Sequence, residues 1–138
     1  MRKSSGTYVL DSHPLLTYFK LQPGWEEVEL LLSQSREADK KLLLSLINWG
    51  EVYYSILADR GEEDAERMER IVEDFPIEIV APDFDMTRQA AIFKSQGGIS
   101  YADCFAAALA VKENAILVTG DPEFKKLEKK GYLKIKWI

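Results

Sequence analysis

Five short apolar runs, separated by longer stretches with helical spacing, constrain the fold of this chain more than any other feature. The runs cover residues 7–10, 42–47, 77–80, 115–119 and 133–137. Strands that alternate with helices of ten or more residues form right-handed crossover units, and such units give a parallel sheet with helices on both faces. The sequence therefore predicts one α/β domain over residues 1–138, with an edge strand at its C-terminal end.

The stretches between the runs repeat large apolar side chains every three or four residues, as amphipathic helices do. We expect helices near residues 15–19 and 25–32, from 48 to 58, over 61–75, from 83 to 96 and over 100–112. The last of these is rich in alanine, which permits close packing against a sheet.

The residue types exclude several kinds of site. One cysteine, Cys104, and one histidine, His13, exclude an internal disulfide, a multi-cysteine zinc site and a His-rich metal site. No segment approaches the ~18 apolar residues that a membrane span requires. Asp11 interrupts the first apolar stretch too early for a signal-peptide core, so we expect a cytoplasmic protein.

Charge is distributed unevenly along the chain. The formal net charge of −5 argues against nonspecific nucleic-acid binding over the whole surface. Six lysines and three acids give residues 121–138 a charge of +3, which leaves −8 for residues 1–120. We expect this end of the chain either to attract phosphate or to form a solvated helix face and an edge strand kept soluble by charge.

Four acidic residues follow the predicted strands or open the predicted helices. Asp11 ends the first strand, and Asp121 follows the fourth. Glu51 lies in the first turn of the helix after the second strand, and Asp103 lies in the first turn of the alanine-rich helix. Ligands of open parallel sheets bind beyond the carboxyl ends of the strands, so all four are candidates for one site. Asp103 reaches that edge only if residues 97–99 fold back over the sheet.

Each acid taken alone also has a structural explanation. Ser, Asn and Asp at a helix start accept backbone N–H groups, and an acid three residues later completes a capping box. The patterns that fit are Asn48-x-x-Glu51, Ser100-x-x-Asp103, Asp121-Pro122, and Asp11 ahead of Pro14. Asp83 and Asp85, which follow Pro82, are interpreted as caps alone.

The four acids together favour a metal site. If their helix starts converge, mutual repulsion raises their pKa values and lowers stability unless a cation neutralises them. Carboxylates without histidine or cysteine suit Mg²⁺ or Mn²⁺, with water and a substrate phosphate completing the coordination. Two such ions can activate a water molecule and stabilise the leaving oxygen of a phosphodiester.

Four segments carry a resemblance to a known family. They are residues 8–12 (YVLDS), 48–52 (NWGEV), 100–108 (SYADCFAAA) and 117–124 (LVTGDPEF). In this order and at this spacing they resemble the PIN-domain ribonucleases, and most of all the VapC-like toxins of toxin–antitoxin modules. The resemblance covers nearly the whole chain, and its last two segments are the most specific.

The resemblance implies a three-layer α/β/α sandwich with a central parallel sheet, and a ribonuclease that depends on Mg²⁺ or Mn²⁺. It further implies a homodimer and an antitoxin partner. The implied metal-binding and catalytic acids are Asp11, Glu51, Asp103 and Asp121, with Ser12 and Thr119 as supporting hydroxyls. His13-Pro14 departs from the family pattern, in which a small residue and a helix former are more common, so His13 is interpreted as a polar loop residue.

Other functions fit less well. A phosphatase requires an Asp-x-Asp pair after the first strand, and a receiver domain requires adjacent acids there. A serine hydrolase requires a Gly-x-Ser-x-Gly turn, and a dinucleotide-binding domain requires Gly-x-Gly-x-x-Gly. The sequence contains none of these patterns at the required place. The alternative that stays open is an inactive binding protein on the same fold, with the acids as helix caps.

Large apolar side chains are concentrated in the first half of the chain, in greater number than one sheet face covers. They predict an exposed groove between helices that binds an amphipathic helix or an extended peptide, unless they are simply core. The residues are Leu15, Leu16, Tyr18, Phe19, Trp25, Val28, Leu31, Leu32, Trp49, Tyr53, Tyr54 and Leu57.

Overall fold

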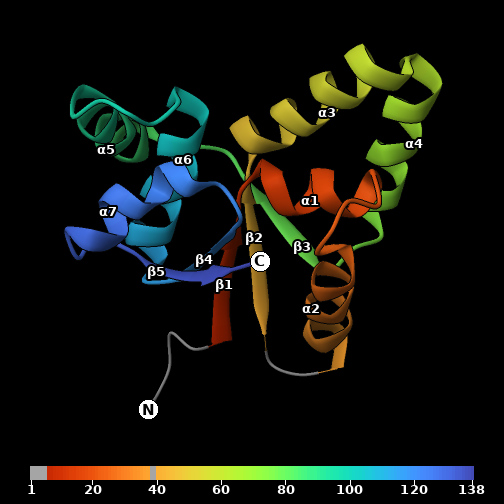
Figure 1. Cartoon of the computed structure of the whole chain (residues 1–138), viewed down its shortest axis with the longest axis horizontal. Coiled ribbons are helices and arrows are strands. Elements are labelled where there is room, and N and C mark those ends of the chain that lie inside the picture. The colour runs from red at the N-terminus through yellow and green to blue at the C-terminus, as the bar shows by residue number, and fades with distance from the viewer. Residues whose placement is uncertain (1–5, 38–39) are drawn as a thin grey trace.

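Five parallel strands form one sheet in the order β3-β2-β1-β4-β5, which confirms the predicted fold (Figure 1). The structure is a computed structural model that describes residues 6–37 and 40–138. The strands are β1 (Thr7–Leu10), β2 (Lys41–Ser45), β3 (Ile77–Val80), β4 (Ile116–Thr119) and β5 (Lys134–Trp137). The helices are α1 (Ser12–Phe19), α2 (Trp25–Glu37), α3 (Leu46–Arg60), α4 (Glu62–Glu73), α5 (Phe84–Ser95), α6 (Tyr101–Glu113), the 3₁₀ helix η2 (Pro122–Phe124) and α7 (Lys125–Lys129). No helix within the two described ranges is long and apolar enough to cross a membrane.

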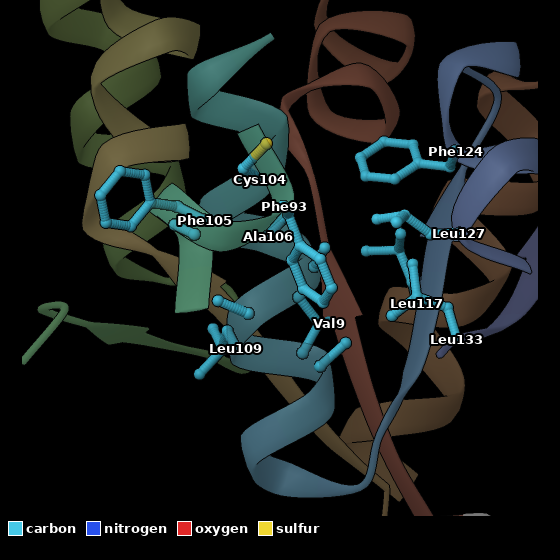
Figure 2. Packing of buried hydrophobic residues seen from close by; sticks show 14 of the residues in the cluster. Val9, Phe93, Cys104, Phe105, Ala106, Leu109, Leu117, Phe124, Leu127 and Leu133 are labelled. Atoms are coloured by element: carbon cyan, nitrogen blue, oxygen red, sulfur yellow. The ribbon is translucent and has the colours of Figure 1, made fainter. Parts of the chain in front are cut away.

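Alternate side chains of the three central strands, β1, β2 and β4, enter two different cores on opposite faces of the sheet. Val9 and Leu117 belong to the core that includes α5, α6 and α7, which Figure 2 shows from close by. The next residues along the same strands, Leu10 and Val118, belong to the core formed with α1 to α4. A strand places successive side chains on opposite faces, so a strand covered on both faces reads as a continuous apolar run. Figure 1 shows the resulting three layers, with α5 to α7 on one side and α1 to α4 on the other.

The predicted strand 42–47 extends too far at its C-terminal end. β2 ends at Ser45, and α3 begins at the next residue. The Ser45 hydroxyl accepts the backbone N–H of Ile47 at 3.2 Å, and so satisfies one of the amides that a helix start leaves free. The predicted capping box of Asn48 and Glu51 is therefore wrong, and Glu51 lies in the second turn of α3.

The connection between α5 and α6 turns sharply at two glycines and leads into α6, whose first turn carries Asp103. Gly97 and the glycine after it have φ angles of 81° and 83°, in the left-handed region that favours glycine. The Nζ atom of Lys126 donates to the Gly97 carbonyl at 3.0 Å, and Nζ of Lys94 donates to the Ile99 carbonyl at 3.0 Å. These two bonds tie the connection to α5 and α7.

The twelve apolar residues of the first half do not all enter the core. Four are buried, six are half-buried, and Tyr54 and Leu57 are exposed. Phe19, Ile56 and Ile71 help to line a surface cavity of about 220 Å³ where α1, α3 and α4 meet. A groove that binds a partner stays a prediction, and this cavity is the place where it would lie.

The N-cap of α3 gives a test of the local structure that carries Glu51. We expect Ser45→Ala to lower the free energy of unfolding by about 1 kcal/mol, because the Ile47 amide loses its acceptor in a buried position. Ser33→Ala, at an exposed position of α2, is the matched control and should change stability by less than about 0.5 kcal/mol. Urea unfolding curves measure both, and equal midpoints for the two variants would contradict the assigned cap.

Candidate metal centre

The strand order changes direction between β1 and β4, and ligands of open parallel sheets bind at such a point. The two strands are neighbours, with Leu10 opposite Val118. The chain leaves β1 through Asp11 into α1, and it leaves β4 through Asp121 into η2. These two acids therefore stand at the carboxyl ends of neighbouring strands, where the strand order reverses.

Asp11 is buried at this edge of the sheet, with 1% of its surface exposed. Its Oδ1 atom accepts the His13 N–H at 3.1 Å, and its Oδ2 atom accepts the Thr119 hydroxyl at 2.8 Å. Burial raises the pKa of Asp11 to about 8, although both hydrogen bonds lower it; the charges of Asp121 and Glu51 raise it further. The side chain therefore lies in a position where its charged form is unfavourable without a cation.

Thr119 connects two of the acids. Its hydroxyl donates to Asp11 and accepts the backbone N–H of Asp121 at 3.0 Å. Thr119 is fully buried at the end of β4, so its side chain is held in one place. The supporting role that the family resemblance implies for Thr119 stays a prediction, and Ser12, the other predicted hydroxyl, is half-buried at the start of α1.

Asp103 lies in the first turn of α6 with only 5% of its surface exposed. The Ser100 hydroxyl accepts its backbone N–H at 3.2 Å. Burial raises the pKa of Asp103 to about 9, and the charges of Asp11, Asp121 and Glu51 and a hydrogen bond with Asp121 act in the same direction. The structure thus brings all four predicted acids together at one edge of the sheet, close enough to repel one another.

Glu51 is held in place by a neighbour on its own helix. The side-chain amide of Asn48 donates to Glu51 Oε1 at 3.1 Å and to the Ala102 carbonyl at 3.1 Å. Asn48 is fully buried, and its Oδ1 atom has no hydrogen-bond partner among the described residues. This one side chain joins α3 to the start of α6, so it fixes the position of Glu51 relative to Asp103.

Glu123 is an acid of this cluster that the sequence reasoning missed. One carboxylate oxygen from each of Asp103, Asp121 and Glu123 lies within 4.8 Å of the others. Glu123 Oε1 also accepts the backbone N–H of Ser100 at 3.1 Å, so η2 is joined to the start of α6. The available signal was its place two residues after Asp121, on the same short helical turn.

Capping and membership of the cluster turn out to be compatible, because each carboxyl group has two oxygen atoms. Asp11 caps α1, and Asp121 caps η2 through the Glu123 N–H at 2.9 Å, as predicted. The predicted capping box at the start of α6 is half correct. Ser100 accepts from Asp103 there, but the Ser100 N–H is bound by Glu123 and not by Asp103.

The two acids that were interpreted as caps alone behave differently from each other. Asp83 caps α5 by accepting the Met86 N–H at 2.8 Å, which confirms the interpretation. Asp85 is not the cap, because it lies inside the first turn of α5 and forms an ion pair with Arg88 at 2.9 Å.

His13 is not a loop residue, because α1 begins at Ser12, one position before it. Its imidazole packs against Gly120, where a Cβ atom would lie 2.5 Å from His13 Cε1. Its Nδ1 atom is buried and has no hydrogen-bond partner among residues 6–37 and 40–138. Burial lowers the pKa of His13, while the charge of Asp121 opposes that shift.

The donor set of the cluster fits a hard divalent cation. Asp103, Asp121 and Glu123 offer carboxylate oxygen atoms within 4.8 Å of one another, and Asp11 and Glu51 lie near enough for their charges to raise the pKa of Asp103. Carboxylate oxygen atoms are the ligands that Mg²⁺ and Mn²⁺ prefer. A cation would offset the repulsion and burial that raise the pKa values of Asp11 and Asp103.

The PIN domain family model matches residues 8–130, so this chain belongs to the PIN domain family. The match includes each of the four acids and both supporting hydroxyls. Among curated proteins, none matches the sequence.

Several solved structures share the fold. VapBC2 from Rickettsia felis, bound to a promoter DNA fragment, gives a TM-score of 0.73 at 20% identity over 96% of this chain and 98% of that chain. VapC20 from Mycobacterium tuberculosis, a sarcin-ricin loop cleaving toxin, gives 0.71 at 13% identity over 87% and 94%. VapBC-1 from nontypeable Haemophilus influenzae gives 0.68 at 22% identity over 95% and 97%. At these identities the likeness is one of fold.

The raised pKa values predict that the metal-free protein loses stability as the pH rises. The ordinary pKa of both Asp11 and Asp103 is 3.8, so between about pH 4 and pH 8 the folded state binds protons that the unfolded state has released. Stability should fall by up to about 1.4 kcal/mol per pH unit for each such carboxyl group.

We expect Asp103→Asn to flatten this pH dependence, and Asp85→Asn, at an exposed ion pair, to retain it. Urea unfolding in EDTA at several pH values measures the slopes, and points above pH 6.5, the ordinary pKa of histidine, avoid the titration of His13. Equal slopes for the wild type and Asp103→Asn would contradict the assigned cluster.

Proposed function

We propose that this PIN-domain protein is a Mg²⁺- or Mn²⁺-dependent endoribonuclease that hydrolyses single-stranded or structured RNA. The observation that carries the proposal is the cluster of Asp11, Glu51, Asp103 and Asp121, in which two buried carboxyl groups have strongly raised pKa values. Such a cluster is unfavourable by itself, and a cation site is the function that explains why it is retained. Family membership and a fold shared with a toxin that cleaves the sarcin-ricin loop support the same conclusion.

In this proposal the four acids hold the cation and the chain positions them in advance. A bound divalent cation supplies a water molecule of lowered pKa and offsets the negative charge of the phosphodiester. Thr119 fixes the Asp11 carboxylate through its hydroxyl, and the Asn48 amide fixes Glu51. Side chains held in this way need no rearrangement to bind, which favours both affinity and rate.

We further propose that the protein is the toxin of a toxin–antitoxin pair and forms a homodimer. Support comes from the shared fold with chains of VapBC structures, and from apolar side chains at the surface such as Tyr54 and Leu57 on α3. The cavity where α1, α3 and α4 meet is the proposed place for an apolar antitoxin segment.

The second candidate is a binding protein of the same fold without catalytic activity. It is favoured by the capping bonds of Asp11 and Asp121, which give both acids a structural reason to be present. It does not explain why Asp103 is buried beside three other acids, so we retain it only as the alternative that experiment must exclude.

We expect the purified protein to cleave RNA when Mg²⁺ or Mn²⁺ is present and not in excess EDTA. Asp11→Asn and Asp103→Asn should each lower the rate by at least about 100-fold, because several kcal/mol of transition-state stabilisation depend on the cation. Asp85→Asn, the same change at an exposed position, should retain the wild-type rate. A gel assay with labelled RNA, with circular dichroism to show that each variant is folded, makes the measurement.

Two results would contradict this mechanism. Full cleavage in EDTA would exclude the metal dependence, and full cleavage by folded Asp103→Asn would exclude the role of the cluster. Metal-dependent melting temperatures together with an absence of cleavage for many RNAs would favour the binding protein.

The proposed partner predicts a particular behaviour on native purification. We expect the chain to elute with a small co-encoded protein, and to elute as a homodimer after that protein is removed with denaturant and the chain is refolded. Size-exclusion chromatography with light scattering measures both masses. Elution of the native protein alone would instead favour a nuclease that acts without an antitoxin.

A further inference from the structure

The C-terminal segment carries a concentration of lysines that take part in no ion pair within the described part of the chain. Seven ion pairs occur among the described residues. None of them includes a lysine between residues 125 and 136, although that segment holds six. In contrast, Lys41, Arg67, Arg88 and Lys112 each have an acidic partner. The positive charge at this end is therefore available to an anionic partner.

Two of these lysines have a structural role that joins the basic segment to the acidic cluster. Lys126 donates to the Gly97 carbonyl, and Lys130 donates to the side chain of Gln96 at 3.1 Å. The connection that they hold leads directly into α6 and Asp103. Two lysines of the basic segment therefore contact the connection that leads to Asp103.

Lys125 and Lys129 are exposed on α7, and no acidic side chain in residues 6–37 or 40–138 forms an ion pair with them. Together with Lys126 and Glu128 they line a surface hollow of about 530 Å³. The Lys125 ammonium lies 6.0 Å from the centre of the Trp137 ring. Glu128, the one acid of α7, accepts a hydrogen bond from Trp137 Nε1 at 3.3 Å, which turns it towards β5.

The chain places this hollow close to the reacting position. η2 links Asp121 directly to α7, so Lys125 follows the acid by four residues and Lys129 follows it by eight. At about 1.5 to 2 Å per helical residue, these lysines lie on the order of 6 to 8 Å and 12 to 16 Å along the helix axis from Asp121.

We propose that Lys125 and Lys129 bind the backbone phosphates of single-stranded RNA next to the cleaved phosphodiester, an inference that rests on the proposed nuclease function. The contrast in charge supports it, since residues 1–120 carry −8 and repel RNA, whereas residues 121–138 carry +3. Phosphate contacts fix the position of a strand without reading its sequence. Lys125 and Lys129 thus supply affinity for RNA and fix the position of the strand, and contacts with the bases have to supply any sequence preference.

The test measures RNA binding without cleavage, by fluorescence anisotropy of a short labelled single-stranded RNA in EDTA at several salt concentrations. The variant is Lys125→Gln with Lys129→Gln, which leaves Lys126 and Lys130 to hold the connection before α6. The control is Lys41→Gln with Arg67→Gln, which removes the same charge from two cations that already have acidic partners, Glu78 on β3 and Glu63 on α4.

The proposal expects the α7 variant to weaken binding by on the order of ten-fold at moderate salt, because each phosphate contact in a single strand contributes about 0.7 to the salt slope. The slope of log affinity against log salt should fall by about 1.4, whereas the control should retain the wild-type slope. An α7 variant that binds RNA as the control does would overturn the proposal. Displacement of the RNA by poly-glutamate at an equal concentration of charge would also overturn it, in favour of an acidic peptide as the partner.

Cleavage of RNA by the wild type in Mg²⁺ is scored separately, so that the two proposals fail in different ways. If the α7 variant loses salt-dependent RNA binding but the wild type cleaves no RNA, the proposed nuclease function is contradicted and the proposed RNA binding by Lys125 and Lys129 is supported. If the wild type cleaves RNA but both variants bind RNA equally well, the proposed RNA binding by Lys125 and Lys129 is contradicted and the proposed nuclease function is supported.

Discussion

The close approach of several carboxyl groups at the carboxyl ends of β1 and β4 is the constraint on which the rest of the site depends. Asp11 and Asp103 are both buried there, and burial together with neighbouring negative charge raises their pKa values to about 8 and about 9. A protein tolerates such a group only when other parts of the fold hold it in place or a cation offsets its charge. Thr119 and Asn48, both fully buried, hold Asp11 and Glu51 in place through hydrogen bonds. The carboxylate oxygen atoms are suited to binding a cation that offsets their charge.

Elements that are far apart in sequence meet at this edge of the sheet and bring the carboxyl groups together. β1 and β4 deliver Asp11 and Asp121 from neighbouring strands, whereas α3 and α6 have to approach each other to deliver Glu51 and Asp103. Asn48 bridges these two helices, and Glu123 bridges η2 and α6. The basic segment that follows η2 then lies beside the acids, so that opposite charges occupy adjacent surfaces of a chain whose net charge is negative.

The layered fold was predictable because strands covered on both faces leave continuous apolar runs, and the parallel order follows from the long helices between them. Helix ends were less predictable. Leu46 and Ile47 look like strand residues, yet the buried hydroxyl of Ser45 starts α3 before them. The four acids could be named from their places after strands, but Glu123 could not, since its contribution depends on how η2 turns towards α6. The turn at Gly97 likewise depends on side chains from α5 and α7 that a linear pattern does not reveal.

The central claim is that these acids together bind a divalent cation, and anomalous diffraction from crystals soaked in Mn²⁺ tests it most directly. The account predicts an anomalous peak at the edge of the sheet within coordination distance of Asp11, Asp103 and Asp121, and loss of that peak in crystals of Asp103→Asn. A fully soaked wild-type crystal with no peak among these carboxylates, or with its peak at another place on the molecule, would contradict the account.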